Sequence, residues 1–157
     1  MNSDAYLTIM GLQRSYADIA TRAAWDEVAA IATPDAHFSF HTSSGRKFEI
    51  EGAVAFGEFG GKMTERFRFY EYIPLNFVVT IGTDGTAHGR SYSLEVAEDA
   101  ETGDWIDFYG MYQDEYALFE GTWRFARRRY RTVGQRTAGR LEIVGSFRET
   151  GDAGSDS

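Results

Sequence analysis

Residues 15–40, SYADIATRAAWDEVAAIATPDAHFSF, hold two stretches with helical spacing followed by an alternating run. Tyr16 and Ile19 continue an apolar stripe that starts at Ile9, and this spacing predicts an amphipathic helix over residues 4–23. Asp18 lies about 200° from Tyr16 around such a helix, since each residue turns it by about 100°. We therefore expect Tyr16 to face the core and Asp18 to face water.

Shorter elements follow this helix. Apolar residues at helical spacing predict a second helix over residues 25–32, and Thr33-Pro34-Asp35 is expected to end it. The run at 37–41, HFSFH, predicts a strand with both phenylalanines on one face, and residues 46–50 can return as a second strand. Residues 52–63, GAVAFGEFGGKM, predict only a weak or broken helix because they are rich in glycine.

The second half of the chain is dominated by strand patterns. Long strands are predicted over residues 70–81, 87–96, 105–119 and 123–133, and residues 140–147 read as a further strand or an arm between subunits. Helices followed by strands are typical of an α+β fold. The sequence thus predicts one domain over residues 1–147, a conical barrel in which a strongly curved antiparallel sheet wraps around two or three N-terminal helices. A disordered tail is expected over residues 148–157.

Composition excludes several classes of function. The 157 residues carry a net charge of −8, which argues against a nucleic-acid partner, because phosphate binding depends on Lys and Arg. Without cysteine the chain has no disulfide, thiolate nucleophile or Cys-based zinc site, and its three scattered histidines do not predict a metal site. The N-terminus matches neither a signal peptide nor a membrane span, so a cytoplasmic protein without a membrane partner is expected.

Three segments together resemble the SnoaL-like branch of the nuclear transport factor 2-like superfamily over roughly residues 5 to 133. They are the opening stretch, the strand containing Asn76 with the following GTAHGRSYSLEV, and MYQDEYALFEGTWRFARRR. The resemblance implies a conical barrel whose open end receives an apolar, often aromatic or polycyclic, small molecule. It also implies a homodimer or homotrimer.

The catalytic residues of several relatives have no counterpart here. The first-helix Asp of the dehydratases and dehydrochlorinases falls on Thr21, and the neighbouring tyrosine of scytalone dehydratase falls on Ala20. Phe40 occupies the position of the strand tyrosine of scytalone dehydratase and of the general-base Asp of ketosteroid isomerase. The histidine of other relatives corresponds to Tyr72 or Ile73. The dehydratase dyad and the isomerase base are therefore absent.

Two residues do match ketosteroid isomerase. Tyr16 falls on its oxyanion-hole tyrosine, and Asp114 falls on its protonated acid if one deletion is allowed in the following loop. A phenol and a neutral carboxylic acid can both donate hydrogen bonds to a developing enolate or alkoxide oxygen. Tyr16 reads equally as a core tyrosine. Asp114 either shares an inward face with Tyr112 or lies outside, in which case Gln113 and Glu115 point inward.

The proton-abstracting group is less well defined. His41 suits general-base chemistry near neutral pH, but alternation places it opposite the two phenylalanines unless the strand ends or bulges there. Arg90 either polarises a substrate oxygen in the cavity or pairs with an acid outside. The charges of residues 127–131 alternate to both faces of a strand and suit salt bridges within or between subunits.

Two functions of different class fit these features. The first is a cofactor-independent lyase, or an allied isomerase or cyclase, in which Tyr16 and Asp114 stabilise an oxygen and His41, Arg90 or Tyr112 moves a proton. Its apolar aromatic substrate would contact Phe40, Phe59, Tyr72, Asn76, Phe108 and Tyr112. The second is a non-catalytic binding or assembly module that kept the cavity and lost the acid and base.

Overall fold

A computed structural model of the chain describes residues 2–148, so the predicted tail, Arg148 apart, lies outside the described residues. In chain order the elements are α1 (Ser3–Arg22), η1 (Trp25–Ala30), β1 (Ala32–His41), β2 (Lys47–Glu51), α2 (Ala53–Thr64), β3 (Phe67–Ile81), β4 (Thr86–Asp99), β5 (Trp105–Phe119), β6 (Thr122–Thr137) and β7 (Arg140–Ile143).

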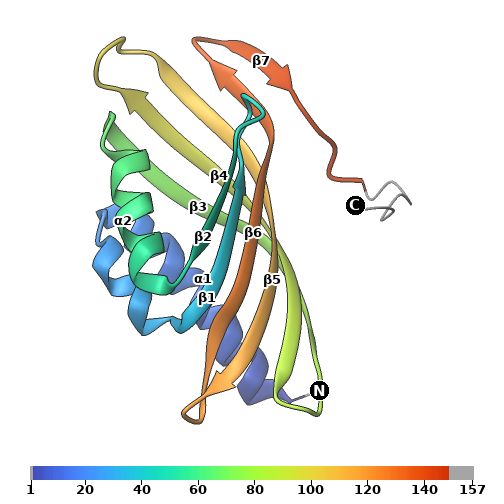
Figure 1. The fold of residues 1–157 in the computed structure, drawn as a ribbon. Helices are drawn as coiled ribbons and strands as arrows, with labels where there is room; N and C mark the ends of the chain where they lie inside the picture. The colour runs from blue at the N-terminus through green and yellow to red at the C-terminus, as the bar shows by residue number, and fades with distance from the viewer. Residues whose placement is uncertain (1, 149–157) are drawn as a thin grey trace.

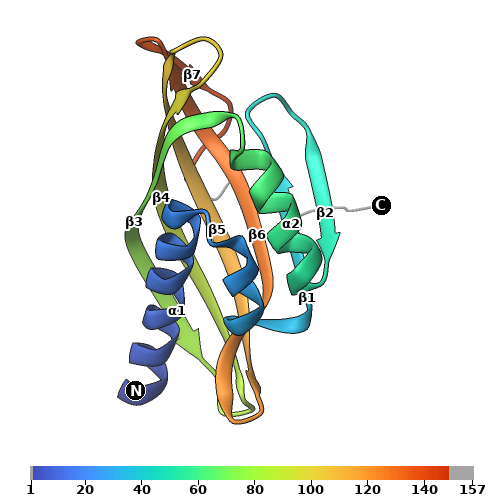
Figure 2. The same ribbon diagram turned by 90° about the vertical axis from the view of Figure 1, so that its left-hand side faces the viewer.

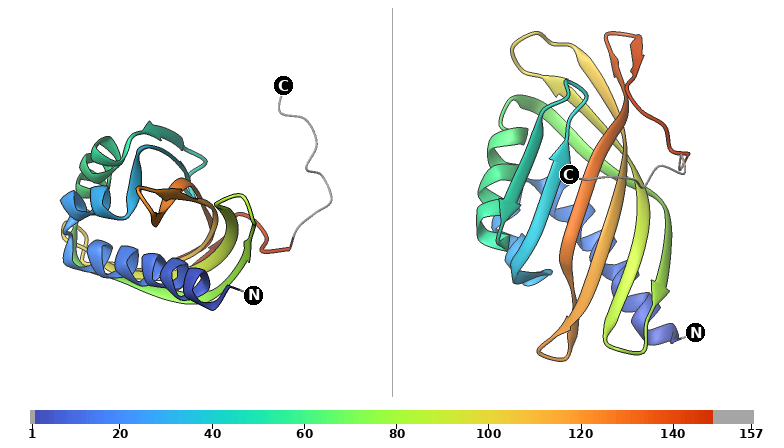
Figure 3. Two further views of the ribbon diagram at one scale, coloured as in Figure 1. Left: turned by 90° about the horizontal axis from the view of Figure 1, so that it is seen from below. Right: turned by 45° about the vertical axis from the view of Figure 1, so that its right-hand side comes forward.

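The strands form one strongly curved sheet whose concave side is covered by the helices (Figures 1 and 2). Its order is β2-β1-β6-β5-β4-β3, and β7 pairs with β6 beyond this path. The view along the sheet in Figure 3 shows α1 and α2 against the hollow of the curve, with β2 and β3 at its open edges. The predicted α+β cone is confirmed, although the sheet does not close into a barrel.

One pairing differs from the predicted antiparallel sheet. β1 runs parallel to β6, whereas every other neighbouring pair is antiparallel. Strands joined by a tight turn must be antiparallel, but β1 and β6 are far apart in the chain and no turn dictates their relative direction.

The first helix follows the prediction closely. Asn2 caps its N-terminus by accepting a hydrogen bond from the Ala5 amide at 3.2 Å, and Ala23 ends it in the left-handed conformation with φ of 54°. Tyr16 lies on the buried face. Asp18 points to solvent, where it forms an ion pair with Arg22 at 2.8 Å. Tyr16 is therefore a group of the interior and Asp18 is not.

Pro34 and the glycine-rich helix depart from the predictions. Pro34 does not end a helix but lies within β1, where the register with β6 shifts between Ala32 and His37. α2 is continuous rather than broken, because Gly57 and Gly60 let it approach Trp25 closely.

Beyond β6 the chain turns back over the outer face of the sheet. Its predicted last run is a strand only over Arg140–Ile143. The Arg131 guanidinium donates a hydrogen bond to the Ser146 carbonyl at 2.7 Å, and the rings of Phe147 and Tyr92 lie 5.4 Å apart. Among the helices of the described chain, none is long and apolar enough to cross a membrane.

The packing of α2 on Trp25 generates a stability prediction. A Cβ at Gly57 would lie 2.5 Å from the Trp25 carbonyl oxygen, which is backbone and cannot rotate away. Gly57→Ala should therefore lower the free energy of unfolding in urea by about 1–3 kcal/mol, the usual cost of overpacking. Gly11→Ala is the matched control, since nothing lies within 4 Å of its added Cβ. The control should be neutral or stabilising by up to about 1 kcal/mol. Equal effects at the two sites would contradict the close approach.

Candidate active site inside the curved sheet

Asp114 points into the interior, which decides between the two faces left open by the sequence. It lies on β5 between Tyr112 and Tyr116, and all three side chains are buried. An ionisable group in such a position is costly unless polar neighbours satisfy it.

The partners of Asp114 form a buried cluster, here called the inner network: Gln13, Asp114, Tyr116 and Arg128. The Gln13 amide donates to Asp114 Oδ2 at 2.8 Å and to the Tyr116 hydroxyl at 2.5 Å, and Arg128 Nη2 donates to Gln13 Oε1 at 2.8 Å. Arg128 Nε lies 3.3 Å from Asp114 Oδ1, and neither side chain has any exposed surface. The network links α1, β5 and β6 through charge and hydrogen bonds.

Arg128 is also enclosed by aromatic rings. Its guanidinium carbon lies 4.0 Å from the ring centre of Tyr16 and 3.8 Å from that of Tyr112. Both distances are within the range of cation–π attraction. Burial raises the pKa of Tyr16 well above its usual value, so its phenol stays neutral.

This geometry changes the interpretation of Asp114. Burial raises the pKa of Asp114, and the charge of Arg128 together with the hydrogen bond from Gln13 opposes that rise. A fully buried guanidinium needs a counter-charge, so we assign Asp114 as the ionised partner of Arg128. The neutral acid that the resemblance implied does not fit a carboxyl in contact with an arginine.

A second polar cluster lies further along β4 and was not among the predicted site residues. This carboxyl cluster consists of Tyr70, Glu95, Tyr130 and Thr132. Glu95 accepts hydrogen bonds from the Tyr70 hydroxyl at 2.6 Å and from the Tyr130 hydroxyl at 3.4 Å. Thr132 in turn donates to the Tyr130 hydroxyl at 3.1 Å.

Glu95 differs from Asp114 in its exposure and in its partners. It is half-buried, and burial raises its pKa above the usual value, although the two tyrosine hydrogen bonds and the charge of Arg128 act in the opposite direction. The neighbouring phenols cannot compensate its charge fully. A carboxyl whose pKa is raised toward neutral pH is suited to general acid–base chemistry.

Aromatic rings line the interior around the carboxyl cluster. Tyr130 packs against Phe40 with ring centres 5.2 Å apart, Phe40 against Phe59 at 5.6 Å, and Phe67 against Tyr70 at 5.8 Å. These phenylalanines and Phe108 are only half-buried. Phe108 lies opposite Glu95 in the β4–β5 register, in the part of the sheet nearer the β4–β5 turn, which is at the top of Figure 1.

Most of the predicted substrate-contacting residues belong to this interior. Phe40, Phe59 and Phe108 are part of the half-buried wall, whereas Tyr72 and Tyr112 are fully packed beneath it. Asn76 is different. It lies at an irregularity of β3, is exposed, and its side chain accepts a hydrogen bond from the Phe77 amide at 2.9 Å.

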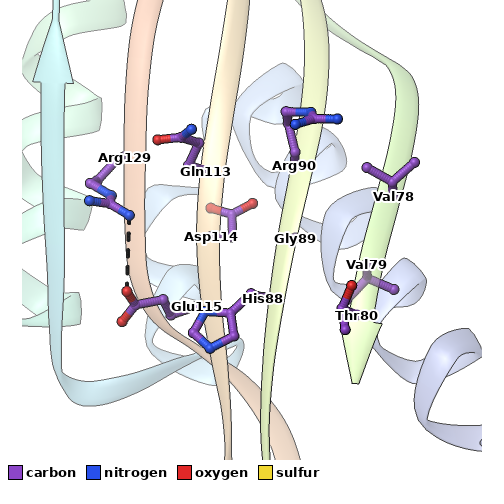
Figure 4. Close-up of a pocket in the computed structure, with 10 residues that line it drawn as sticks. All are labelled: Val78, Val79, Thr80, His88, Gly89, Arg90, Gln113, Asp114, Glu115 and Arg129. Atoms are coloured by element: carbon purple, nitrogen blue, oxygen red, sulfur yellow. Dashed lines mark ion pairs between the residues drawn. The ribbon is translucent and has the colours of Figure 1, made fainter. Parts of the chain in front are cut away.

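The structure does not bring His41 and Arg90 to Tyr16 and Asp114. His41 lines a cleft on the outer face of the sheet. Arg90 lines a neighbouring cleft on the same face, as Figure 4 shows. β1 keeps its alternation to its end, so His41 lies opposite the two phenylalanines and the sheet separates it from the interior.

The sequence did not identify Glu95 as a site residue because the apolar residues of β4 face outward, against the usual rule. In SYSLEV the apolar set is Tyr92, Leu94 and Val96, and the rule that apolar residues face the core would turn Glu95 outward. The structure turns Ser91, Ser93 and Glu95 inward instead. The outer apolar set is partly covered by the C-terminal segment, where Phe147 packs on Tyr92.

Several buried polar groups of the interior have an atom without a hydrogen-bond partner within residues 2–148, among them Ser93, Tyr112, Asp114 and Arg128. Ser93 on β4 is 1% exposed, and its hydroxyl finds no hydrogen-bond partner within residues 2–148. Buried hydroxyls are normally paired with protein, water or ligand. Across the same described range, no group of three or more His, Cys, Asp or Glu is arranged to hold a metal ion.

The inner network generates a mutational prediction. Arg128→Met leaves Asp114 charged and buried without its partner, so the free energy of unfolding should fall by about 3–5 kcal/mol. Arg129→Met is the matched control, because Arg129 follows Arg128 on β6 but points outward with 48% of its side chain exposed. The control should change stability by no more than about 1 kcal/mol in the same denaturant titration. Similar losses for both variants would rule out a special role for the buried pair.

The pKa of Glu95 generates a prediction about pH. Between the usual pKa of 4.5 and the raised value, the folded protein binds more protons than the unfolded chain, so its stability falls as pH rises through that interval. Glu95→Gln removes this loss. The melting temperature of the variant minus that of the wild type should therefore be more positive at about pH 8 than at about pH 4. Glu101→Gln, on the exposed β4–β5 turn, should show no such trend. A difference that shrinks with rising pH would contradict the raised pKa.

Solved structures with the same architecture come from several bacteria. A candidate scytalone dehydratase from Novosphingobium aromaticivorans aligns with 94% of this chain and 99% of its own, with a TM-score of 0.75 and 20% identity. The hexachlorocyclohexane dehydrochlorinase LinA-type3 from Novosphingobium barchaimii aligns with 94% of each chain, with a TM-score of 0.73 and 14% identity. An NTF2-like protein with a cystatin-like fold from N. aromaticivorans covers 83% of this chain and 82% of its own, with a TM-score of 0.68 and 15% identity.

These structural similarities establish the fold, and a match to a family of sequences establishes the family. No curated protein sequence matches the chain significantly. The profile of the SnoaL-like domain, however, matches residues 2–129, which include α1, the inner network and Glu95. The chain therefore belongs to the SnoaL-like domain family.

Proposed function

We propose that this protein is a cofactor-independent lyase that acts on an apolar aromatic or polycyclic small molecule, with Glu95 as the group that moves the proton. The observation that carries the proposal is the carboxyl of Glu95, a half-buried residue, which accepts hydrogen bonds from Tyr70 and Tyr130 beside the aromatic rings of the interior. Apolar walls with a few convergent polar groups are the usual design of small-molecule sites.

The chemistry follows from one ionisable group with two fixed donors. For loss of water, ionised Glu95 would accept a proton from a substrate carbon, and the same carboxyl would return it to the departing hydroxyl oxygen. For release of a small carbonyl fragment, Glu95 would instead accept the proton of a substrate hydroxyl as the adjacent C–C bond breaks; the freed electron pair would expel a second oxygen, which takes up that proton and leaves as water. Burial raises the pKa of both Tyr70 and Tyr130 well above the usual value, so these phenols would donate hydrogen bonds rather than protons. No electron transfer is required, which is why no redox cofactor enters the proposal.

The family supports elimination as the reaction class. Structural neighbours with the same fold include the candidate scytalone dehydratase and the dehydrochlorinase named above, whose names both denote eliminations. An isomerisation or cyclisation would use the same proton transfer with a different fate for the intermediate. Tyr16 and Asp114 would act by positioning: they hold Arg128, whose positive charge favours the ionised form of Glu95. His41 and Arg90, on the outer face, take no part in this scheme.

A second candidate function rests on Thr21, which stands where dehydratase relatives carry an acid. Its hydroxyl accepts a hydrogen bond from the Tyr72 amide at 3.0 Å and so ties α1 to β3. That structural use favours a chain that lost the family dyad and kept the fold as a binding or assembly module. The expected homodimer or homotrimer fits either function and stays a prediction.

Turnover by single-residue variants tests the enzyme proposal. Purified protein would be incubated with aromatic diols, phenols, stilbene-like compounds and steroids, and each mixture examined by mass spectrometry for loss of water or formaldehyde. For any converted compound, Glu95→Gln should reduce turnover by at least about 100-fold, the usual contribution of a general acid or base. Tyr70→Phe should reduce it less. Glu101→Gln, on the exposed turn, should leave it unchanged.

The remaining outcomes separate the two candidates. A compound that raises the melting temperature but is recovered unchanged would support the binding module. Conversion that survives in Glu95→Gln but is lost in Asp114→Asn, with the fold intact, would move the chemistry to the inner network. Full turnover in both variants would refute both assignments.

A further inference from the structure

The outer face of the sheet carries a band of cations in an otherwise acidic protein. Arg127, Arg129 and Arg131 alternate along β6 and point away from the interior, whereas Arg128 between them points inward. Alternate residues of a strand lie about 7 Å apart, so the three arginine side chains project from one row of backbone positions. The net charge of the chain is −8, which makes a cationic row on one face a local exception.

Strand register extends this row across the sheet. Arg129 lies opposite Gln113 on β5, and Gln113 lies opposite Arg90 on β4. On the other side of β6, Arg131 lies opposite His41 on β1, which lies opposite Lys47 on β2. Four strands therefore bring cations or an amide donor to the same face, and His41 of β1 lies between Arg131 and Lys47.

Acidic neighbours compensate only part of this charge. Glu49 and Glu51 each lie 2.5 Å from a ring nitrogen of His37, whose single positive charge offsets one of their two negative charges. Glu115 approaches Arg129 only to 4.0 Å, the dashed contact in Figure 4. Within residues 2–148, Arg127 and Lys47 form no ion pair. Without counting Arg90, the four cations Arg127, Arg129, Arg131 and Lys47 therefore outnumber the two acidic charges that His37 leaves on this face.

Two clefts give a ligand access to these cations. One has a volume of about 390 Å³, and its lining includes Arg90, Gln113 and Arg129 together with the acids Asp114 and Glu115, as Figure 4 shows. The other, of about 380 Å³, is lined by Arg127, Arg129, Arg131 and Lys47. Arg129 and Gln113 border both clefts. Each volume falls in the range of small-molecule sites.

We propose that this outer face is a binding site for a small organic polyanion, with two or more carboxylate or phosphate groups bridging Arg129 and its cationic neighbours. Arginine's planar fork of donors matches both carboxylate and phosphate oxygens. The Gln113 amide adds a neutral donor between two arginines. The sheet separates this site from Glu95 and the aromatic interior, so the proposal is independent of the lyase function.

Titration calorimetry with two probes tests the site on the whole protein. Tripolyphosphate and adipate would be titrated at fixed ionic strength, with acetate as a monoanion. We expect one bound molecule of at least one polyanion per chain, and the stronger probe identifies the preferred group as phosphate or carboxylate. Arg129→Gln should weaken this binding by at least about tenfold, because a charge-assisted hydrogen bond is lost.

Arg14→Gln is the matched control, since it removes the same charge from an exposed position on α1. It should change the affinity less than twofold, and both variants should keep the wild-type melting temperature. The proposal is overturned if neither polyanion binds, or if Arg14→Gln weakens binding as much as Arg129→Gln does. It is also overturned if sedimentation shows a dimer that Arg129→Gln dissociates while the probes do not bind, because the face would then be a subunit interface.

Discussion

A buried guanidinium sets the constraint on which the interior of this protein depends. Arg128 has no exposed surface, so its charge must be met inside the sheet by Asp114, by Gln13 and by the faces of Tyr16 and Tyr112. Removing one partner would leave a charge without compensation in a medium of low dielectric constant. The pair therefore fixes β5 against β6, and Gln13 fixes α1 over both strands.

The same constraint separates the roles of the two carboxyl groups that face the interior. Asp114 lies opposite Gly89 of β4, and Glu95 lies six residues further along that strand, about 20 Å for an extended chain. Asp114 is committed to Arg128 and is closed to solvent. Glu95 is bound by neutral phenols, is half-buried, and has its pKa raised by burial. Two acids in one interior thus acquire different chemistry from their surroundings, which is the pattern expected where one is structural and the other reactive.

The sequence was most informative where the spacing of apolar residues was compatible with few structures. The stripe containing Tyr16 placed α1 and its inward face, and alternation around Asp114 allowed only two faces, of which the structure has the inward one. It was least informative where long-range packing reverses a local rule. Glu95 faces inward because the C-terminal segment partly covers the apolar face of β4. Likewise α2 is continuous because Trp25 occupies the space its glycines leave. Identifying Arg128 as the partner of Asp114 required the register between β5 and β6, which cannot be derived from a single sequence.

The division between a locked and a reactive carboxyl is tested most directly by a ¹³C NMR titration of the Asp and Glu side-chain carboxyl groups. Asp114→Asn and Glu95→Gln would assign the two resonances. The account predicts that Asp114 stays ionised at neutral pH, whereas Glu95 titrates above the usual range of a glutamate while the protein is folded. A protonated Asp114 at neutral pH, together with a Glu95 that titrates at its usual value, would contradict it.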